Sequence, residues 1–335
     1  MARTETAFLC ESPASIDRVY GQGRRETIGR ISQLYPSCLS RSMLVEHAPR
    51  LRDVQAVFST WGMPTLDRQD LALLPALKLV LYGAGSVKGF AEPLLDAGIT
   101  VVSAWQANAV PVAEFTLAQI LLANKGYFRN APACSHSLAG WKGAFRDIRG
   151  NYGRTVAILG AGAIGRKLIE LLRPFKLAVV VWDPFLSAES ARGLGVEKVE
   201  TLAEAFGRGA VVSNHLANVP ETRGLLTGAL FDRLPEDATF INTGRGTTVR
   251  EDEMAAVLAR RPDLSALLDV TDPEPPVSDS PLYALPNVHL TSHIAGSIGD
   301  EVVRMGDYMI EEFLAWEAGR PLRCAVTRAM LSTMA

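Results

Sequence analysis

Apolar, β-branched runs alternate with longer helix-like stretches from residue 76 onward, and this alternation constrains the fold more than any other feature. Runs that are apolar on both faces and separated by helices are typical of parallel sheets covered on both sides. The sequence therefore predicts an α/β protein with doubly wound parallel sheets. Because 335 residues exceed what one hydrophobic core usually serves, we expect two domains. The runs occupy residues 77–82, 99–104, 154–160, 177–183, 210–215, 238–243, 264–270 and 288–293.

Proline and glycine mark the boundaries of the predicted helices and loops. Pro111 in the first turn and Gly126 after the last predict a helix that is apolar on all sides, which favours burial in a core or at a subunit contact. Residues 127–152 contain Trp141 and mixed charges without a clear period, so we expect a long connecting arm there. Five prolines make 271–287 a stiff loop, and 299–319 is predicted to be the last amphipathic helix.

Composition excludes several classes of function. The formal net charge is 34 minus 36, or -2, without a long basic block, which argues against nucleic-acid and membrane-surface partners. The cysteines are scattered and form no CxxC pair, which argues against a metal site or a disulfide framework. With neither a signal-peptide pattern nor an apolar run of about 18 residues, we expect a soluble protein of the reducing cytoplasm. The cysteines are Cys10, Cys38, Cys134 and Cys324.

A glycine-rich turn between a predicted strand and a predicted helix indicates a dinucleotide. Gly160, Gly162 and Gly165 form GxGxxG, which permits a tight turn, close approach of a pyrophosphate and close packing of helix on strand. Asp183 ends the next predicted strand, where a carboxylate accepts hydrogen bonds from ribose hydroxyls and repels the extra phosphate of NADP. Alone, Asp183 would be interpreted as a helix cap or turn former; together with the glycines it favours NAD.

Polar groups end three later predicted strands, and ligands collect at the carboxyl ends of strands in open α/β sheets. Arg245 lies between two glycines that would let a ligand approach the backbone, Glu274 lies in the proline loop and His293 follows a strand. Each alone has a structural explanation, such as a solvated arginine or a satisfied histidine. Together they supply a carboxylate anchor, an orienting acid and a proton donor, which reduction of a 2-keto acid requires.

An ordered series of motifs resembles the NAD-dependent D-isomer-specific 2-hydroxyacid dehydrogenases. The match extends from about Leu77 to about Leu322, whereas the first 70 residues match only loosely. Its motifs are GAGSVKGF, ANAVPVAEFTLA, VAILGAGAIG, the WDP that contains Asp183, PETRGLL, INTGRG, DVTDPEP, LPNVHLTSHIAG and GRPL.

The resemblance implies roles for individual residues. Arg245 corresponds to the arginine that binds the substrate, Glu274 to the acid paired with the catalytic histidine, and His293 to the general acid/base. Asp269 corresponds to the residue that holds the nicotinamide carboxamide, and the backbone amides of Ala84 and Gly85 to a loop that grips the substrate carboxylate. The implied cofactor contacts are Gly160, Gly162, Ala163, Ile164, Gly165, Asp183, Leu216, Thr243, Gly244, Asp269, His293, Ala295 and Gly296.

The resemblance also implies an architecture. It consists of two Rossmann-like domains with the active site in the cleft between them. Residues 1–106 plus 300–335 would form a flavodoxin-like substrate-binding domain, and 107–299 the NAD-binding domain. The implied partners are a small 2-keto or 2-hydroxy acid and a second copy of the chain, in a homodimer formed through the cofactor domain.

Departures from the family pattern bear on the cofactor and the substrate. Ala163 replaces a frequent arginine, which predicts a looser hold on the pyrophosphate, whereas Ser292 and Ala217 replace prolines and remove no catalytic group. Trp61 stands where phosphoglycerate-specific members place an arginine, which argues against a phosphorylated substrate.

Two other functions remain open at this point. The same fold serves NAD-sensing corepressors that bind partner peptides, which the intact Arg245, Glu274 and His293 argue against. It also serves dehydrogenases of formate or phosphite, which share the cofactor. The sequence does not identify the substrate side chain. Four residues could line a pocket for an apolar side chain, although a place in a core is the more usual role for each: Trp61, Trp105, Trp141 and Met305.

Overall fold

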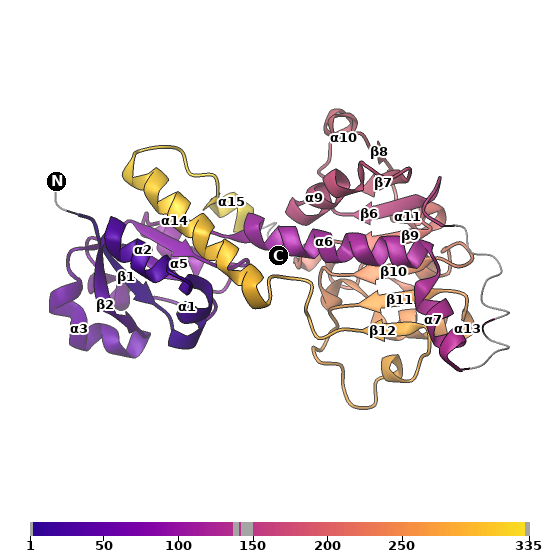
Figure 1. Cartoon of the computed structure of the whole chain (residues 1–335), viewed down its shortest axis with the longest axis horizontal. Coiled ribbons are helices and arrows are strands. Elements are labelled where there is room, and N and C mark those ends of the chain that lie inside the picture. Colours follow the sequence, from indigo (N-terminus) through magenta and orange to yellow (C-terminus); the bar gives the residue numbers. More distant parts are fainter. Residues whose placement is uncertain (1–2, 137–140, 142–149, 332–335) are drawn as a thin grey trace. The chain divides into compact units, whose positions relative to one another are not determined.

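The computed structural model describes residues 3–136, 141 and 150–331, and the chain divides into two compact units (Figure 1). Unit 1 consists of Met1–Asn108 and Ser297–Ala335, and unit 2 of Ala109–Gly296. Each unit is built around its own, largely parallel sheet. The predicted α/β class is confirmed.

Unit 1 contains a six-stranded sheet of order β13-β5-β4-β3-β1-β2 within its described residues. The strands are parallel except for β13, which pairs antiparallel with β5. Side chains in β1 alternate between two cores: Ala7 and Leu9 face one, and Phe8 faces the other. Both faces of the sheet are therefore covered. The strands are β1 (Glu5–Leu9), β2 (Gln33–Leu39), β3 (Val54–Ser59), β4 (Leu79–Tyr82), β5 (Thr100–Ser103) and β13 (Ala325–Val326).

The helices of unit 1 come from both ends of the chain. The predicted last helix is confirmed as η5 (Gly299–Val302) followed by α14 (Val303–Glu317). It packs closely against the first helix, since a Cβ at Gly306 would lie 2.5 Å from the carbonyl oxygen of Val19. The remaining helices are α1 (Pro13–Tyr20), α2 (Arg24–Ile31), η1 (Arg41–Met43), α3 (Leu44–Leu51), α4 (Arg68–Ala72), α5 (Ala91–Asp96) and α15 (Arg328–Leu331).

Unit 2 contains a seven-stranded parallel sheet of order β12-β11-β10-β9-β6-β7-β8 within its described residues. Chain order reverses around β6, which lies between β7 and β9. Such a switch point leaves a crevice at the carboxyl ends of the strands, where ligands bind in this type of sheet. The strands are β6 (Thr155–Leu159), β7 (Ala178–Trp182), β8 (Glu197–Lys198), β9 (Val211–Asn214), β10 (Thr239–Asn242), β11 (Ser265–Leu268) and β12 (Val288–Leu290).

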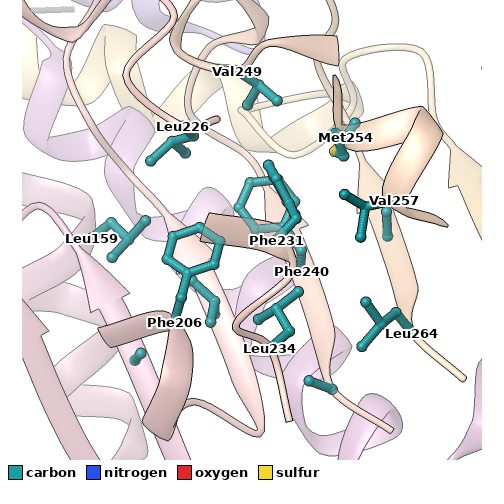
Figure 2. Packing of buried hydrophobic residues seen from close by; sticks show 14 of the residues in the cluster. Leu159, Phe206, Leu226, Phe231, Leu234, Phe240, Val249, Met254, Val257 and Leu264 are labelled. Atoms are coloured by element: carbon teal, nitrogen blue, oxygen red, sulfur yellow. The ribbon is translucent and has the colours of Figure 1, made fainter. Parts of the chain in front are cut away.

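An aromatic cluster forms the centre of one core of unit 2 (Figure 2). The ring of Phe231 packs edge-on against Phe240 with centroids 4.9 Å apart, and Phe206 packs against both. The helices of unit 2, together with α6, which begins at the end of unit 1, are α6 (Trp105–Asn124), α7 (Tyr127–His136), α9 (Ala163–Leu172), α10 (Ala188–Leu194), α11 (Leu202–Arg208), η2 (Pro220–Thr222), α12 (Gly228–Phe231), η3 (Gly246–Thr248), α13 (Glu251–Arg260) and η4 (Pro281–Tyr283).

Two predictions about helices need correction. Helix α6 begins at Trp105, so Pro111 lies inside the helix and not in its first turn. The arm predicted at 127–152 begins as helix α7, and most of its remainder lies outside the described residues. The first error arises because proline marks a helix start only when the residues before it leave the helical conformation. Among the described helices, none has the length and apolar character that a membrane span requires.

Candidate active site

The glycine turn of unit 2 lies between β6 and α9. Gly160 has φ +93°, which favours glycine, and a Cβ at Gly165 would lie 2.1 Å from the carbonyl oxygen of Gly160. These two glycines are therefore required by the turn and by helix packing. A Cβ at Gly162 would meet no described atom within 4 Å, although Gly162 caps the amino terminus of α9. The space in front of this helix terminus fits the pyrophosphate of a dinucleotide.

Asp183 connects the end of β7 to this turn. One carboxylate oxygen accepts the backbone N–H of Ala161 at 2.7 Å, and the other accepts that of Phe185 at 2.7 Å. Asp183 thus stabilises a turn, which is one of the two interpretations that the sequence left open for this residue. Each carboxylate oxygen can accept a second hydrogen bond, so ribose hydroxyls are compatible with these contacts.

An imidazole and a carboxylate form a pair at the same edge of the sheet. Nδ1 of His293 lies 2.6 Å from Oε1 of Glu274, and both side chains are about half exposed. His293 follows β12, and Glu274 belongs to the proline loop after β11. Because Nδ1 faces the acid, Nε2 is the ring nitrogen that can exchange a proton with a substrate.

The backbone of His293 adopts a left-handed conformation with φ +57°, which is uncommon for a residue with a side chain. Asp269, only 2% exposed, holds this loop. Its backbone oxygen accepts the N–H of His293 at 3.0 Å. Its carboxylate accepts the Thr291 hydroxyl at 2.6 Å and the N–H groups of Ile294 at 2.8 Å and Ala295 at 2.9 Å. Asp269 therefore orders the loop that presents the imidazole.

Arg245 follows β10 and is partly buried. Its Nη1 donates to the carbonyl oxygen of Gly244 at 2.7 Å. Burial lowers the pKa of Arg245, and the negative charge of Glu274 partly opposes this shift. The carboxylate of Glu274, which is paired with His293, therefore favours the charged form of the Arg245 guanidinium. An arginine of this kind can bind a carboxylate through two parallel hydrogen bonds.

The glycine after Arg245 has a different purpose from the one expected. We interpreted it as an opening for a ligand, but a Cβ at Gly246 would lie 2.0 Å from the carbonyl carbon of Thr271. Gly246 thus lets the loop after β11 approach the loop after β10. Gly244 is also close to protein, since its Cβ would lie 3.1 Å from the backbone oxygen of Asn214.

His215, at the end of β9, was not identified from the sequence. Its Nε2 lies 2.9 Å from the Ser213 hydroxyl, and its Nδ1 lies 3.5 Å from that of Thr243, which in turn lies 3.1 Å from Thr116 Oγ1. Burial lowers the pKa of His215 to about 4, so the ring is neutral at pH 7. Its position as the last residue of a predicted strand, like that of Thr243, was a signal that could have identified it.

The predicted substrate loop lies in unit 1, after β4. The backbone N–H of Ala84 already donates to the carbonyl oxygen of Tyr82 at 2.8 Å, and the Ser103 hydroxyl donates to the carbonyl oxygen of Ala84 at 2.9 Å. An amide engaged in this way is a poorer donor for a substrate, so Gly85 is the stronger candidate. Met305 is fully buried and belongs to the core.

Trp61 follows β3 in the same unit. It is partly buried, and the Arg18 guanidinium lies 5.0 Å from its ring centroid. Its place at the carboxyl end of a strand keeps it a candidate for contact with a substrate. The two other tryptophans considered for a pocket differ in exposure: Trp105 is partly buried, and Trp141 is 66% exposed.

A parallel sheet with a glycine turn at its switch point, and with an arginine and an acid–imidazole pair at the same edge, defines a dinucleotide-binding protein of the dehydrogenase class. Residues 119–295 match the family model described as D-isomer specific 2-hydroxyacid dehydrogenase, NAD binding domain. The chain belongs to this family, and the matched residues are its NAD-binding domain. The family inferred from the sequence motifs is thus confirmed.

The individual relatives share about a quarter to a third of their aligned residues with this chain. The chain is 27% identical over 291 residues to a D-3-phosphoglycerate dehydrogenase of Archaeoglobus fulgidus, covering 86% of this chain and 54% of the relative. It is 32% identical over 233 residues to a (S)-sulfolactate dehydrogenase of Chromohalobacter salexigens, covering 69% and 74%. A phosphoglycerate oxidoreductase from Rhizobium etli has the same fold, with a TM-score of 0.84, 24% identity and coverage of 98% and 100%. The chain spans about half the length of the phosphoglycerate dehydrogenases that it matches.

Two alanine substitutions in the glycine turn are expected to have different effects. Gly162→Ala adds a methyl group to open space, so folding is retained while NADH affinity falls about tenfold or more, equivalent to about 1.4 kcal/mol. Gly165→Ala forces a methyl group onto the Gly160 carbonyl and destabilises the unit by about 1–3 kcal/mol or more. Calorimetric NADH titration and thermal unfolding of both variants check this. An unchanged NADH affinity in Gly162→Ala would show that the pyrophosphate does not bind at this turn.

Proposed function

We propose that the chain is an NAD-dependent dehydrogenase that interconverts a small 2-keto acid and a D-2-hydroxy acid. The observation that carries this proposal is the 2.6 Å pair of His293 and Glu274, at the same edge of the sheet as Arg245. Membership of the 2-hydroxyacid dehydrogenase family supports the reaction class. NAD, when bound, accepts or supplies the hydride.

The side chains of unit 2 divide the remaining work. Arg245 binds and orients the substrate carboxylate, and its hydrogen bond to Gly244 limits how far the guanidinium can turn. Nε2 of His293 donates a proton to the substrate oxygen in reduction and accepts it in oxidation. Glu274 accepts Nδ1–H and so keeps the ring in the tautomer and orientation that this proton transfer requires.

The residues at the switch point would hold the cofactor. The open space before Gly162 suits the pyrophosphate, Asp183 the ribose, and Ala163, Ile164 and Leu216 the adenosine side. On the nicotinamide side we place the residues that end β10 and follow β12, with Asp269 beneath them. These residues are Thr243, Gly244, His293, Ala295 and Gly296.

The remaining features of this proposal concern the substrate and the assembly. Gly85 and Ala84 would contact the substrate carboxylate, in a substrate-binding domain at 1–106 plus 300–335, with the cofactor domain at 107–299. Relatives are named for phosphoglycerate and sulfolactate, but Trp61 in place of an arginine favours a substrate without phosphate. We further propose a homodimer in the cytoplasm.

A panel of 2-keto acids with NADH or NADPH tests this function. Oxidation of NADH by at least one keto acid is expected, with slower oxidation of NADPH because Asp183 repels a 2′-phosphate. The pH optimum for reduction should lie below that for oxidation, because His293 begins protonated in one direction and neutral in the other. Binding of NADH without its oxidation by any keto acid, together with no reduction of NAD by formate or phosphite, would contradict the proposal and favour a dinucleotide-sensing protein.

A further inference from the structure

Glu251, the first residue of α13, contacts the loop that carries Glu274. Its Oε1 accepts the backbone N–H of Asp272 at 2.8 Å, and Asp272 precedes Glu274 by two positions. Glu251 is partly buried in this contact. A side chain of α13 thus holds the loop between β11 and the acid of the His293 pair.

Two further contacts restrain the same short segment. Gly246 packs against the backbone of Thr271 and Asp272 so closely that a Cβ would lie 2.0 Å from the former and 2.5 Å from the latter. The Thr271 hydroxyl donates to the carbonyl oxygen of Pro273 at 2.8 Å. Gly246 follows Arg245 directly, so the segment before Glu274 is fixed between the arginine loop and α13.

We propose that Glu251 is a positioning residue that fixes the backbone at Asp272, so that Glu274 stays on Nδ1 of His293. The proposal rests on the proposed function, because only that function gives the orientation of His293 a catalytic consequence. Among the described residues, Glu251 makes no hydrogen bond or ion pair with His293 or Arg245, and it acts through the loop. A misplaced catalytic group lowers the rate even when substrate and cofactor still bind.

Charge makes this contact dependent on pH. Burial, with a smaller contribution from the negative charge of Asp272, raises the pKa of Glu251 to about 7. Glu251 is therefore protonated below about pH 7 and becomes a carboxylate as the pH rises through this value. An ionised carboxylate is the stronger acceptor for the Asp272 N–H, so this one hydrogen bond strengthens at higher pH, although burial makes the charged form less favourable overall. The charged groups around the contact are Asp272, Arg223, whose Nη2 lies 3.9 Å from Asp272, the pair Arg250–Glu253 at 3.4 Å, and Asp252.

The same shift has a consequence for stability. Because the folded-state pKa of Glu251 is raised above the ordinary value of 4.5, its contribution to stability is full at low pH and is lost as the pH rises through about 7. Glu251→Gln removes the titrating charge and keeps a side-chain oxygen that can accept the Asp272 N–H. This variant should therefore gain stability relative to the parent chain as the pH increases.

Two substitutions of Glu251 in the full chain distinguish a role in positioning Glu274 from a role in folding alone. With NADH and the best keto acid of the panel, Glu251→Ala should lose roughly ten- to a hundredfold in kcat at about pH 8 with its NADH affinity retained. Glu251→Gln should recover most of this loss. It should also lack the part of the pH dependence near pH 7 that the parent chain shows. The exposed neighbour Asp252, changed to Asn, is the matched control and should behave like the parent chain.

A second readout needs no turnover. The backbone amide resonance of Asp272 should shift with a midpoint near pH 7 in the parent chain and in Asp252→Asn, and should not do so in either Glu251 variant. Parental kcat and pH profile in Glu251→Ala, or an Asp272 amide that does not respond near pH 7, would overturn the proposal. Should Glu251→Ala fail to fold, the pH profile of Glu251→Gln decides. Absence of turnover in the parent chain defeats the proposed function, while the amide titration reports separately on the contact.

Discussion

Replacement of His293 by glutamine is expected to lower kcat/KM for reduction of a 2-keto acid by about 10²- to 10⁴-fold, because glutamine cannot deliver a proton to the carbonyl oxygen. The imidazole is paired with Glu274 through Nδ1, which leaves Nε2 for this transfer. NADH affinity should change little, within about threefold, equivalent to less than about 1 kcal/mol. Steady-state kinetics and calorimetric NADH titration measure the two effects.

His289→Gln provides the matched control for this substitution. His289 lies in β12, four positions before His293, and packs against the ring of Phe128. The control should keep parental kinetics. If His293→Gln retained a tenth or more of the parental kcat/KM, with the same dependence on pH, the proton would have to come from another group.

Arg245→Ala is expected to lower kcat/KM for every active keto acid by about 30- to 4,000-fold, the equivalent of about 2–5 kcal/mol for loss of one partner in a buried charged contact. Most of this effect should be a rise in KM, because the guanidinium binds the substrate carboxylate before the reaction and during it. Arg245→Lys should recover only part of the loss, because an ammonium lacks the planar fork that binds both carboxylate oxygens.

The exposed Arg233 is the control for charge in the same unit, and Arg233→Ala should leave the kinetics unchanged. Parental KM and kcat in Arg245→Ala would show that the substrate carboxylate is bound elsewhere. Equal activity of Arg245→Lys and the parent chain would show that only charge, and not the forked geometry, is needed.

The apolar runs from residue 154 onward were sufficient to predict the strands in the central part of the seven-stranded sheet of unit 2. Each run is buried on both faces, so its sequence is continuously apolar. The edge strands β2, β8 and β13 were missed, whereas the edge strand β12 was predicted; β1 and β3, which lie inside the sheet of unit 1, were missed as well. Strand β2 contains Pro36 and several exposed residues, and β8 is only two residues long.

The candidate catalytic residues could be identified because each follows a strand of a parallel sheet, where side chains gather at one edge. Contacts between loops could not be identified in this way. Asp269 accepts hydrogen bonds from the His293 loop, and Glu251 accepts one from Asp272. Each of these hydrogen bonds joins residues more than 20 positions apart. The purpose of Gly246 likewise depends on a backbone from another loop. Such contacts depend on the register and packing of the loops, for which the sequence contains no periodic signal.

The most direct test of the central claim is a crystal structure of the full chain with NADH and oxamate, an unreactive analogue of a 2-keto acid. We expect the oxamate carboxylate to lie on the Arg245 guanidinium, with its carbonyl oxygen within about 3 Å of Nε2 of His293. His293 should still be paired with Glu274 in this complex. Oxamate bound without contact to Arg245, or His293 turned away from both Glu274 and the ligand, would contradict the account.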